Sequence, residues 1–150
     1  MSLITYKKKR KFNKTSEPKP KLKKSNKKLI YMIHDHKASH HHWDLRLEIN
    51  GVLKSWALPK QPPKTKGVKR LAIQVEDHPL DYADFKGVIP KGNYGAGTVK
   101  IWDKGTYELI KKNPKEIKIV LYGKKLKRDY VLIKTHYGNK PEKSWLFFKI

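Results

Sequence analysis

Apolar and polar residues alternate without a break over residues 43–49, which predicts a β-strand with one buried face. A second apolar run covers residues 52–58, and Asn50-Gly51 joins the two. This dipeptide favours a two-residue type I′ turn, because both of its positions need positive φ. The resulting hairpin sets Arg46 opposite Ser55 and Asp44 opposite Ala57. We expect its core face to hold Trp43, Leu45, Leu47, Ile49, Val52, Trp56 and Leu58.

The rest of the chain also reads as short strands separated by turns. In the strand near residues 70–77 we expect Leu71, Ile73 and Val75 to point inward. The chain shows no convincing amphipathic helix and no internal repeat, so we predict a mainly β fold, an antiparallel barrel or sandwich. The other strands are expected from Leu29 to Ile33 and near residues 98–102, 106–110, 116–122, 129–135 and 144–149, with turns at Lys104-Gly105, Gly123 and Gly138-Asn139.

Charge indicates the kind of partner. The 150 residues carry a net charge of +23, and the first 30 hold 12 Lys and Arg against one acid. Residues 31–150 hold 24 against 12, so both parts are basic, which favours a polyanionic partner such as nucleic acid. The alternative is a merely solubilising, lysine-rich composition of the kind found in thermophiles.

The composition also suggests one core and a basic extension. We divide the chain into an arm, residues 1–28, and a domain, residues 29–150; the arm is rich in lysine, interrupted by Pro18 and Pro20, and by composition alone disordered. The chain has no cysteine, no apolar run near 18 residues, and lysines where a secretory signal needs an apolar core. We therefore expect a soluble, cytoplasmic protein without disulfides, thiolate metal sites or membrane contact.

Histidines are concentrated just before the predicted strand at residues 43–49: five of the seven lie within residues 34–42. The alternation puts His42 on the polar face with Asp44, one same-face step of about 6.6 Å away. His36, six residues upstream, is the candidate for a third ligand. Two imidazoles and a carboxylate suit manganese, zinc or ferrous iron, and the small Ser55 and Ala57 would leave space above them. The alternative is a solvated histidine-rich loop, or an ordinary surface ion pair.

A further histidine, His78, stands at a predicted strand end before Pro79. Site residues are often carried at such positions on a rigid scaffold. A lone histidine there is more often an ordinary surface residue.

Several motifs together resemble one family, the 3′-phosphoesterase domain of bacterial DNA ligase D and its stand-alone archaeal and bacterial relatives. The resemblance covers nearly the whole chain. It rests on His36…His42-Trp-Asp44-Leu-Arg46-Leu-Glu48, Gly51 to Lys60, Lys69-Arg70-Leu-Ala, Val75-Glu-Asp-His78-Pro-Leu-Asp-Tyr82, Ile89 to Val99 and Ile101-Trp-Asp103. In the arm, Tyr6…Arg10…Phe12…Thr15…Glu17-Pro18 resembles the family's opening motif, so the arm is expected to belong to the working enzyme.

The resemblance implies a compact antiparallel β-barrel with a crescent-shaped active-site groove for the 3′ end of a DNA primer. It implies a manganese-dependent enzyme, with zinc or another divalent ion able to occupy the site. This enzyme removes a 3′-terminal ribonucleoside from a primer-template and then hydrolyses the remaining 3′-phosphate to a hydroxyl. Such end healing belongs to DNA repair by non-homologous end joining, before a polymerase and a ligase act.

The resemblance also implies roles for individual residues, which we assign from their positions in the matching motifs. The resemblance implies that His36, His42 and Asp44 are the metal ligands, the same three that the strand pattern suggests. The expected phosphate ligands are Arg46, Lys60, Arg70 and His78, and Glu76 and Tyr82 also contribute to catalysis.

Some positions depart from the family pattern. His34-Asp35 stands where Gln-Lys is expected, so His34, like His40 and His41, is a candidate alternative ligand. Lys11 replaces a residue that is often acidic, which questions an acidic contribution from the arm. Arg128 stands where relatives tend to have glycine.

Two other classes remain open. A ferrous oxygenase also uses two histidines and a carboxylate, but its second histidine would have to be remote, and His136 is the only candidate. A non-catalytic nucleic-acid-binding barrel needs only basic charge and exposed aromatic rings. No arginine follows His136 closely, as an oxygenase would need, and the binding barrel leaves the pattern of Asp44, Arg46 and His78 unexplained.

Overall fold

A computed structural model describes residues 3–12, 14–18, 20 and 28–150. The described residues form nine strands: β1 (Leu29–Lys37), β2 (His41–Ile49), β3 (Val52–Leu58), β4 (Lys69–Pro79), β5 (Gly87–Ile89), β6 (Gly97–Asn113), β7 (Glu116–Tyr122), β8 (Lys127–Lys134) and β9 (Ser144–Lys149). One short helix, α1 (Ile4–Lys8), and two 3₁₀ turns, η1 (Leu80–Asp84) and η2 (Pro141–Lys143), complete them. None of the helices in the described part has the length and apolar character needed to cross a membrane.

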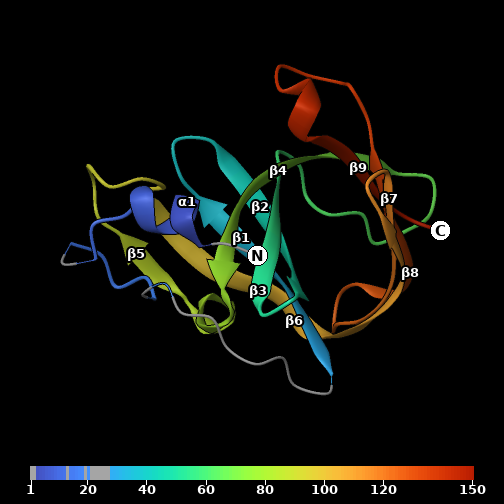
Figure 1. Cartoon of the computed structure of the whole chain (residues 1–150), viewed down its shortest axis with the longest axis horizontal. Helices are drawn as coiled ribbons and strands as arrows, with labels where there is room; N and C mark the ends of the chain where they lie inside the picture. Colours follow the sequence, from blue (N-terminus) through green and yellow to red (C-terminus); the bar gives the residue numbers. More distant parts are fainter. Residues whose placement is uncertain (1–2, 13, 19, 21–27) are drawn as a thin grey trace.

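The strands close into an antiparallel barrel rather than a sandwich. Their order is β1-β2-β3-β4-β9-β8-β7-β6, and pairing of β1 with β6 closes the ring, while β5 pairs with β6 outside it. Closure removes the free edges that an open sheet would expose. Figure 1 shows β7, β8 and β9 at one end of the molecule and α1 and β5 at the other.

The predicted hairpin is confirmed. Asn50 and Gly51 have φ of 52° and 81°, as a type I′ turn requires. The register of β2 and β3 is the expected one, with Arg46 opposite Ser55 and Asp44 opposite Ala57. The polar face of β2 therefore points away from the barrel core.

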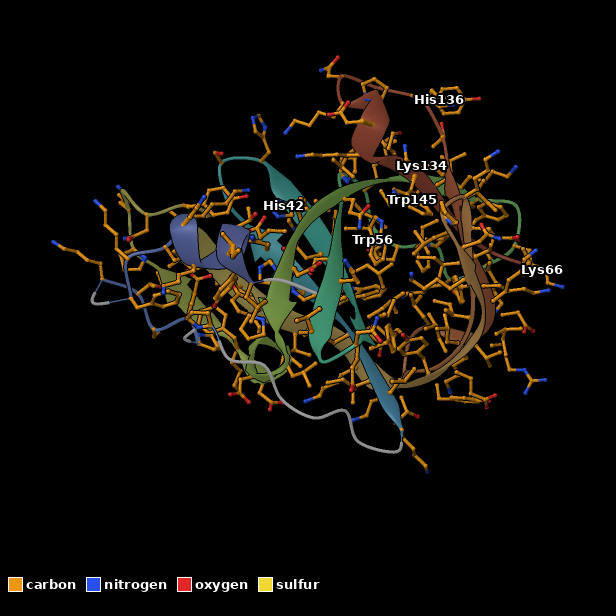
Figure 2. The ribbon with its side chains drawn as sticks, in the orientation of Figure 1. His42, Trp56, Lys66, Lys134, His136 and Trp145 are labelled. Atoms are coloured by element: carbon orange, nitrogen blue, oxygen red, sulfur yellow. The ribbon has the colours of Figure 1, made fainter. Side chains whose placement is uncertain are left out.

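Two hydrophobic clusters lie on opposite faces of the sheet. The first fills the barrel, where Trp56 and Trp145 meet edge to face with ring centroids 6.1 Å apart (Figure 2). The second lies outside the barrel, between β1, β3, α1 and η1, and it includes Val52, which we expected on the core face of the hairpin. Its buried members are Leu3, Tyr6, Met32, Val52, Leu53, Tyr82, Ala83, Phe85, Ile89 and Val99. This second cluster attaches the arm to the barrel.

One predicted turn is wrong. Residues 98–102 and 106–110 belong to a single strand, β6, which runs through Lys104-Gly105. The first half of the strand pairs with β1 along residues 98–107, and the second half pairs with β7 along residues 106–113. A side chain at Gly105 would meet the Tyr122 carbonyl at 2.2 Å, so this glycine permits close strand approach instead of a turn.

The faces of β4 are also opposite to expectation. Gln74 pairs with Trp56, which points into the barrel, so Gln74 and Ala72 share the interior face. Trp145 donates its indole N–H to the Gln74 side-chain oxygen, 3.3 Å away. Leu71, Ile73 and Val75 consequently lie half-buried on the outer face. A pattern of apolar residues at odd positions was not enough to tell the two faces apart.

The described part of the arm is packed, against the disorder that its composition alone predicts. The Tyr6 ring is completely buried, Glu17 is 4% exposed, and both contact the barrel domain. The arm residues 1–2, 13, 19 and 21–27 lie outside the described residues.

Arg128 adopts a backbone conformation that suits glycine. Its φ is 82°, in the left-handed region, and it pairs with Leu121 near the start of β8. Glycine adopts this conformation without strain, whereas an arginine does so at a cost.

Candidate metal and phosphate site

A cavity of about 460 Å³ opens on the outer face of the barrel, where the arm and the segment after β4 cover β1 to β4. Ala57 forms part of its wall beside Asp44, as the hairpin register predicts. Other lining residues come from the arm, from β1, β2, β4, η1 and β5, from the β1–β2 turn, and from the segments before β6 and before η2: Arg10, His36, Ala38, Ser39, His40, His42, Arg46, Val75, Glu76, His78, Tyr82, Ile89, Tyr94, Gly95 and Lys140.

The three predicted metal ligands meet at this cavity. His36 faces His42 across the β1–β2 pair, and Asp44 follows His42 by one same-face step. Asp44 Oδ1 lies 3.3 Å from His42 Nε2, and its Oδ2 lies 3.5 Å from His36 Nδ1. One donor atom from each residue lies within 4.8 Å of the other two, and in the described part of the chain no other group of three such residues meets this criterion.

Backbone carbonyls orient both imidazoles toward the same point. His36 donates its Nε2–H to the Gly95 carbonyl at 2.7 Å, which leaves Nδ1 facing Asp44. His42 donates its Nδ1–H to the His40 carbonyl at 2.9 Å, which leaves Nε2 facing Asp44. Histidine ligands of metals are commonly held by such a bond from the other ring nitrogen. Each ring therefore turns its other nitrogen toward the carboxylate.

The electrostatics of the cluster keep Asp44 ionised. Burial disfavours the charged carboxylate, but Arg46 and hydrogen bonds from the two histidines hold the pKa of Asp44 well below its usual range. Burial likewise disfavours a charged His42, yet the hydrogen bond and charge of Asp44 raise the pKa of His42. The carboxylate therefore attracts cationic charge at this point, either a proton on the imidazole or a metal ion.

Arg46 lies next to the cluster and is almost fully buried, with 3% of its surface exposed. Its Nη1 donates to Ser55 Oγ at 2.8 Å, and its Nη2 lies 3.4 Å from Asp44 Oδ2. Its Nε donates to His34 Nδ1 at 3.2 Å. These three contacts fix the orientation of the guanidinium, as a rigid anion-binding group requires.

His78 lies between two guanidiniums. Its Nε2 accepts a hydrogen bond from Arg10 at 3.2 Å, and its Nδ1 lies 3.3 Å from Arg46 Nη1 and 2.9 Å from the Glu76 carbonyl. Burial, together with Arg46 and Arg10, lowers the pKa of His78 well below its usual value. The ring is thus neutral, with its proton on Nδ1 directed at the carbonyl.

The arm completes the cavity through Arg10. Its guanidinium donates to Glu17 at 2.8 Å and to Glu76 at 3.1 Å. Tyr82 donates its hydroxyl to the same Glu17 at 2.6 Å, and Lys9 pairs with Glu76 at 3.2 Å. Although burial opposes ionisation, Arg10 and Lys9 lower the pKa of Glu76. The predicted site residues Glu76 and Tyr82 are thus tied to the arm.

Two predicted phosphate ligands do not reach the cavity. Lys60 is exposed in the loop after β3, and Arg70 donates to the Gln61 carbonyl at 2.8 Å. Arg70 and Val75 stand five residues apart on β4, so they lie on opposite faces, and Val75 is the one that lines the cavity. The phosphate role of these two residues stays a prediction without geometric support.

The candidate alternative ligands are also separate from the cluster. His34 bonds to Arg46, His40 lines the cavity wall without joining the group, and His41 pairs with Asp35 at 2.6 Å. His136, the remote histidine that an oxygenase would need, is exposed between β8 and β9, well away from His42 (Figure 2).

Sequence reasoning gave no role to several residues of the site. The opening motif contains Arg10 and Glu17, but nothing in the spacing indicates that they reach His78 and Tyr82. Ser55 was expected only as a small residue, and it proves to be a hydrogen-bond partner of Arg46. The Gly95 carbonyl could not have been found, because no side-chain signal marks it.

The fold and the site define a class: small antiparallel β-barrels with a two-histidine, one-carboxylate cluster beside a buried arginine. Residues 34–134 match the family described as the DNA Ligase D 3′-phosphoesterase domain, and the chain belongs to this family. It is 46% identical to the multifunctional non-homologous end joining protein LigD of Pseudomonas aeruginosa over 98% of the chain. The protein of the same description from Mycolicibacterium smegmatis and the multifunctional non-homologous end joining DNA repair protein LigD of Mycobacterium tuberculosis are each 44% identical, over 96% and 89% of the chain. The chain spans about a fifth of the length of these relatives: 18%, 20% and 18%.

Proposed function

We propose that this chain is a metal-dependent DNA 3′-end-healing phosphoesterase. It would remove a 3′-terminal ribonucleoside from a primer-template and hydrolyse the remaining 3′-phosphate to a hydroxyl. The observation that carries the proposal is the meeting of His36, His42 and Asp44 with the buried Arg46 in one cavity. Family membership supports a phosphoesterase, and the choice of a ribonucleoside substrate rests on the family resemblance.

The donor set fits a divalent cation such as manganese or zinc. His36 Nδ1, His42 Nε2 and an Asp44 oxygen would hold it, because each imidazole has its other nitrogen bonded to a carbonyl. When bound, the ion would withdraw charge from a phosphate oxygen and favour nucleophilic attack at phosphorus. The opening of the cavity leaves substrate access to this point.

Arg46 would bind the phosphate beside the ion. Its planar group presents two terminal nitrogens, and its contacts with Ser55 and Asp44 hold their direction before substrate arrives. A fixed cation that faces the oxygens as negative charge develops stabilises the transition state more than the ground state.

His78 has a proposed role that follows from its neutral state. An entering phosphate would offset the positive charges of Arg46 and Arg10, the two groups that, with burial, lower the pKa of His78. Phosphate binding and protonation of this ring are thus expected to be coupled. The protonated ring would then be able to stabilise or protonate the leaving oxygen.

The substrate is proposed to be DNA because the net charge of +23 suits a polyanion. The described relatives are named as multifunctional end-joining proteins, whereas this chain matches about a fifth of their length. We propose that polymerase and DNA ligase activities complete the repair after this chain has prepared the 3′ end.

The testing experiment incubates a 5′-labelled primer-template ending in one ribonucleotide with the protein and Mn²⁺. We expect loss of the terminal ribonucleoside, then conversion of the 3′-phosphate to a hydroxyl, and no reaction after chelation until Mn²⁺ is restored. Binding without any shortening would favour the non-catalytic barrel and would overturn the proposal. Oxidative products that require oxygen would favour the oxygenase.

A further inference from the structure

His34 is a buried histidine that the proposed chemistry does not use. It lies on β1 two residues before His36, opposite Asp44 in the β1–β2 register, and its side chain is inaccessible to solvent. In spite of this position it is not part of the three-residue donor group. Its neighbours suggest a different role.

Both ring nitrogens of His34 already have partners. Nδ1 accepts a hydrogen bond from Arg46 Nε at 3.2 Å, and Nε2 donates to the Phe85 carbonyl at 2.8 Å. Only a neutral ring protonated on Nε2 satisfies the two contacts together. A metal ion bound at Nδ1 would displace the Arg46 bond, so the geometry argues against a ligand role.

The bond from His34 determines the direction of the Arg46 guanidinium. The group is planar, so holding Nε on one edge leaves only a limited set of orientations for the two terminal nitrogens. Those nitrogens point to Ser55 Oγ at 2.8 Å and toward Asp44 Oδ2 at 3.4 Å. Tyr82 closes the remaining side, with its ring centroid 4.9 Å from the guanidinium carbon.

His34 also connects Arg46 to the segment that carries Tyr82. Phe85 follows η1 directly, and its N–H bonds to the Tyr82 carbonyl at 3.1 Å. The Tyr82 ring meets the His34 ring edge to face, with centroids 5.5 Å apart. A single imidazole therefore fixes the relative positions of β1, Arg46 and η1.

We propose that His34 is a positioning residue, which aims the Arg46 guanidinium at the scissile phosphate and does not bind the metal. This inference rests on the proposed function for its catalytic consequence, whereas the contact between His34 and Arg46 is independent of it. Glutamine is the conservative replacement, because its amide offers an acceptor for Arg46 and a donor for Phe85 at similar reach. Asparagine is one methylene shorter and cannot reach both Arg46 and the Phe85 carbonyl. Leucine has neither a hydrogen-bond acceptor nor a donor in its side chain.

The experiment compares His34→Gln, His34→Asn and His34→Leu with the wild type. For His34→Leu and His34→Asn we expect kcat on a 3′-phosphate primer-template to fall at least about tenfold with a smaller change in KM, because positioning matters most in the transition state. His34→Gln should stay within about threefold of the wild type. Manganese content should be equal in all four proteins.

A second measurement does not depend on turnover. The Nε–H signal of Arg46 in a proton–nitrogen NMR spectrum of the metal-free protein should keep its position in His34→Gln and move in the other two variants. If His34→Leu fails to fold, His34→Asn and His34→Gln still make the comparison.

Three results would overturn the inference: loss of manganese in any variant, a wild-type kcat in folded His34→Asn, or an Arg46 Nε–H signal whose position is the same in all variants. If the wild type itself does not turn over, the proposed function fails, but the Arg46 signal still tests the contact. The two failures are therefore distinguishable.

Discussion

Replacing Asp44 by asparagine tests the centre of the site, since it removes the charge and keeps the shape. Asp44 is 5% exposed and Arg46 is 3% exposed, and the two approach to 3.4 Å. Removing one partner of a buried ion pair costs about 3–5 kcal/mol, because the other charge stays buried without compensation. Here Arg46 keeps hydrogen bonds to the neutral Ser55 and His34, so we expect the lower end, about 3 kcal/mol.

The metal should be lost together with the charge. Asp44 is the only anion of the proposed donor set, and an amide oxygen is a weaker ligand, so manganese affinity and turnover should each fall at least about 100-fold. Manganese content after dialysis, turnover of the ribonucleotide-ended primer, and urea unfolding with excess chelator measure the three effects separately.

Asp84→Asn is the matched control. Asp84 pairs with Lys104, but its side chain is 77% exposed and lies outside the cavity. Exposed pairs contribute at most about 1 kcal/mol, so this variant should keep its metal and its activity. If Asp44→Asn retained manganese and turnover, or lost no more stability than Asp84→Asn, the assignment of Asp44 as ligand and as counter-charge of Arg46 would be refuted.

Four further predictions concern other parts of the molecule. Arg46→Lys should retain its metal and DNA affinity but turn over at least about tenfold more slowly in single-turnover assays, because one ammonium cannot replace the planar fork; an unchanged rate would contradict this. Arg128→Gly should raise the free energy of unfolding in urea by about 1 kcal/mol, since φ of 82° strains an arginine, and no gain would mean that the strand relieves the strain. Burial and Arg46 lower the pKa of His34 from 6.5 to about 3, so below pH 6.5 the unfolded chain binds a proton that the folded chain does not. Wild-type stability should therefore fall as pH drops from 6.5 to 3, by up to about 1.4 kcal/mol per pH unit more than in His34→Gln, and parallel curves would argue against a neutral buried ring. Deleting residues 1–28, which include 12 basic residues, should make primer-template binding less sensitive to salt. The slope of the logarithm of the binding constant against the logarithm of the salt concentration should become shallower by about 0.9 for each lost phosphate contact, and an unchanged slope would mean that the arm does not touch DNA.

The sequence by itself determined the β2–β3 hairpin and the metal-ligand candidates. Strict alternation over residues 43–49, with Asn50-Gly51 after it, was enough to obtain the hairpin and its register, because both depend on neighbours in the chain. The same alternation placed His42, Asp44 and Arg46 on one face. Where the signal was a single strand pattern without a turn to fix it, as in β4, the prediction chose the wrong face.

Only the tertiary structure decided which distant groups meet. Strand order decides that β1 and β6 close the barrel and that Arg70 lies outside the cavity. The path of the arm decides that Arg10 contacts His78. The physical reason is that a side chain's charge state and partner depend on what surrounds it in space. His34 shows this most clearly, since its sequence position beside His36 suggested a ligand, whereas burial against Arg46 and the Phe85 carbonyl makes it a neutral hydrogen-bonding bridge.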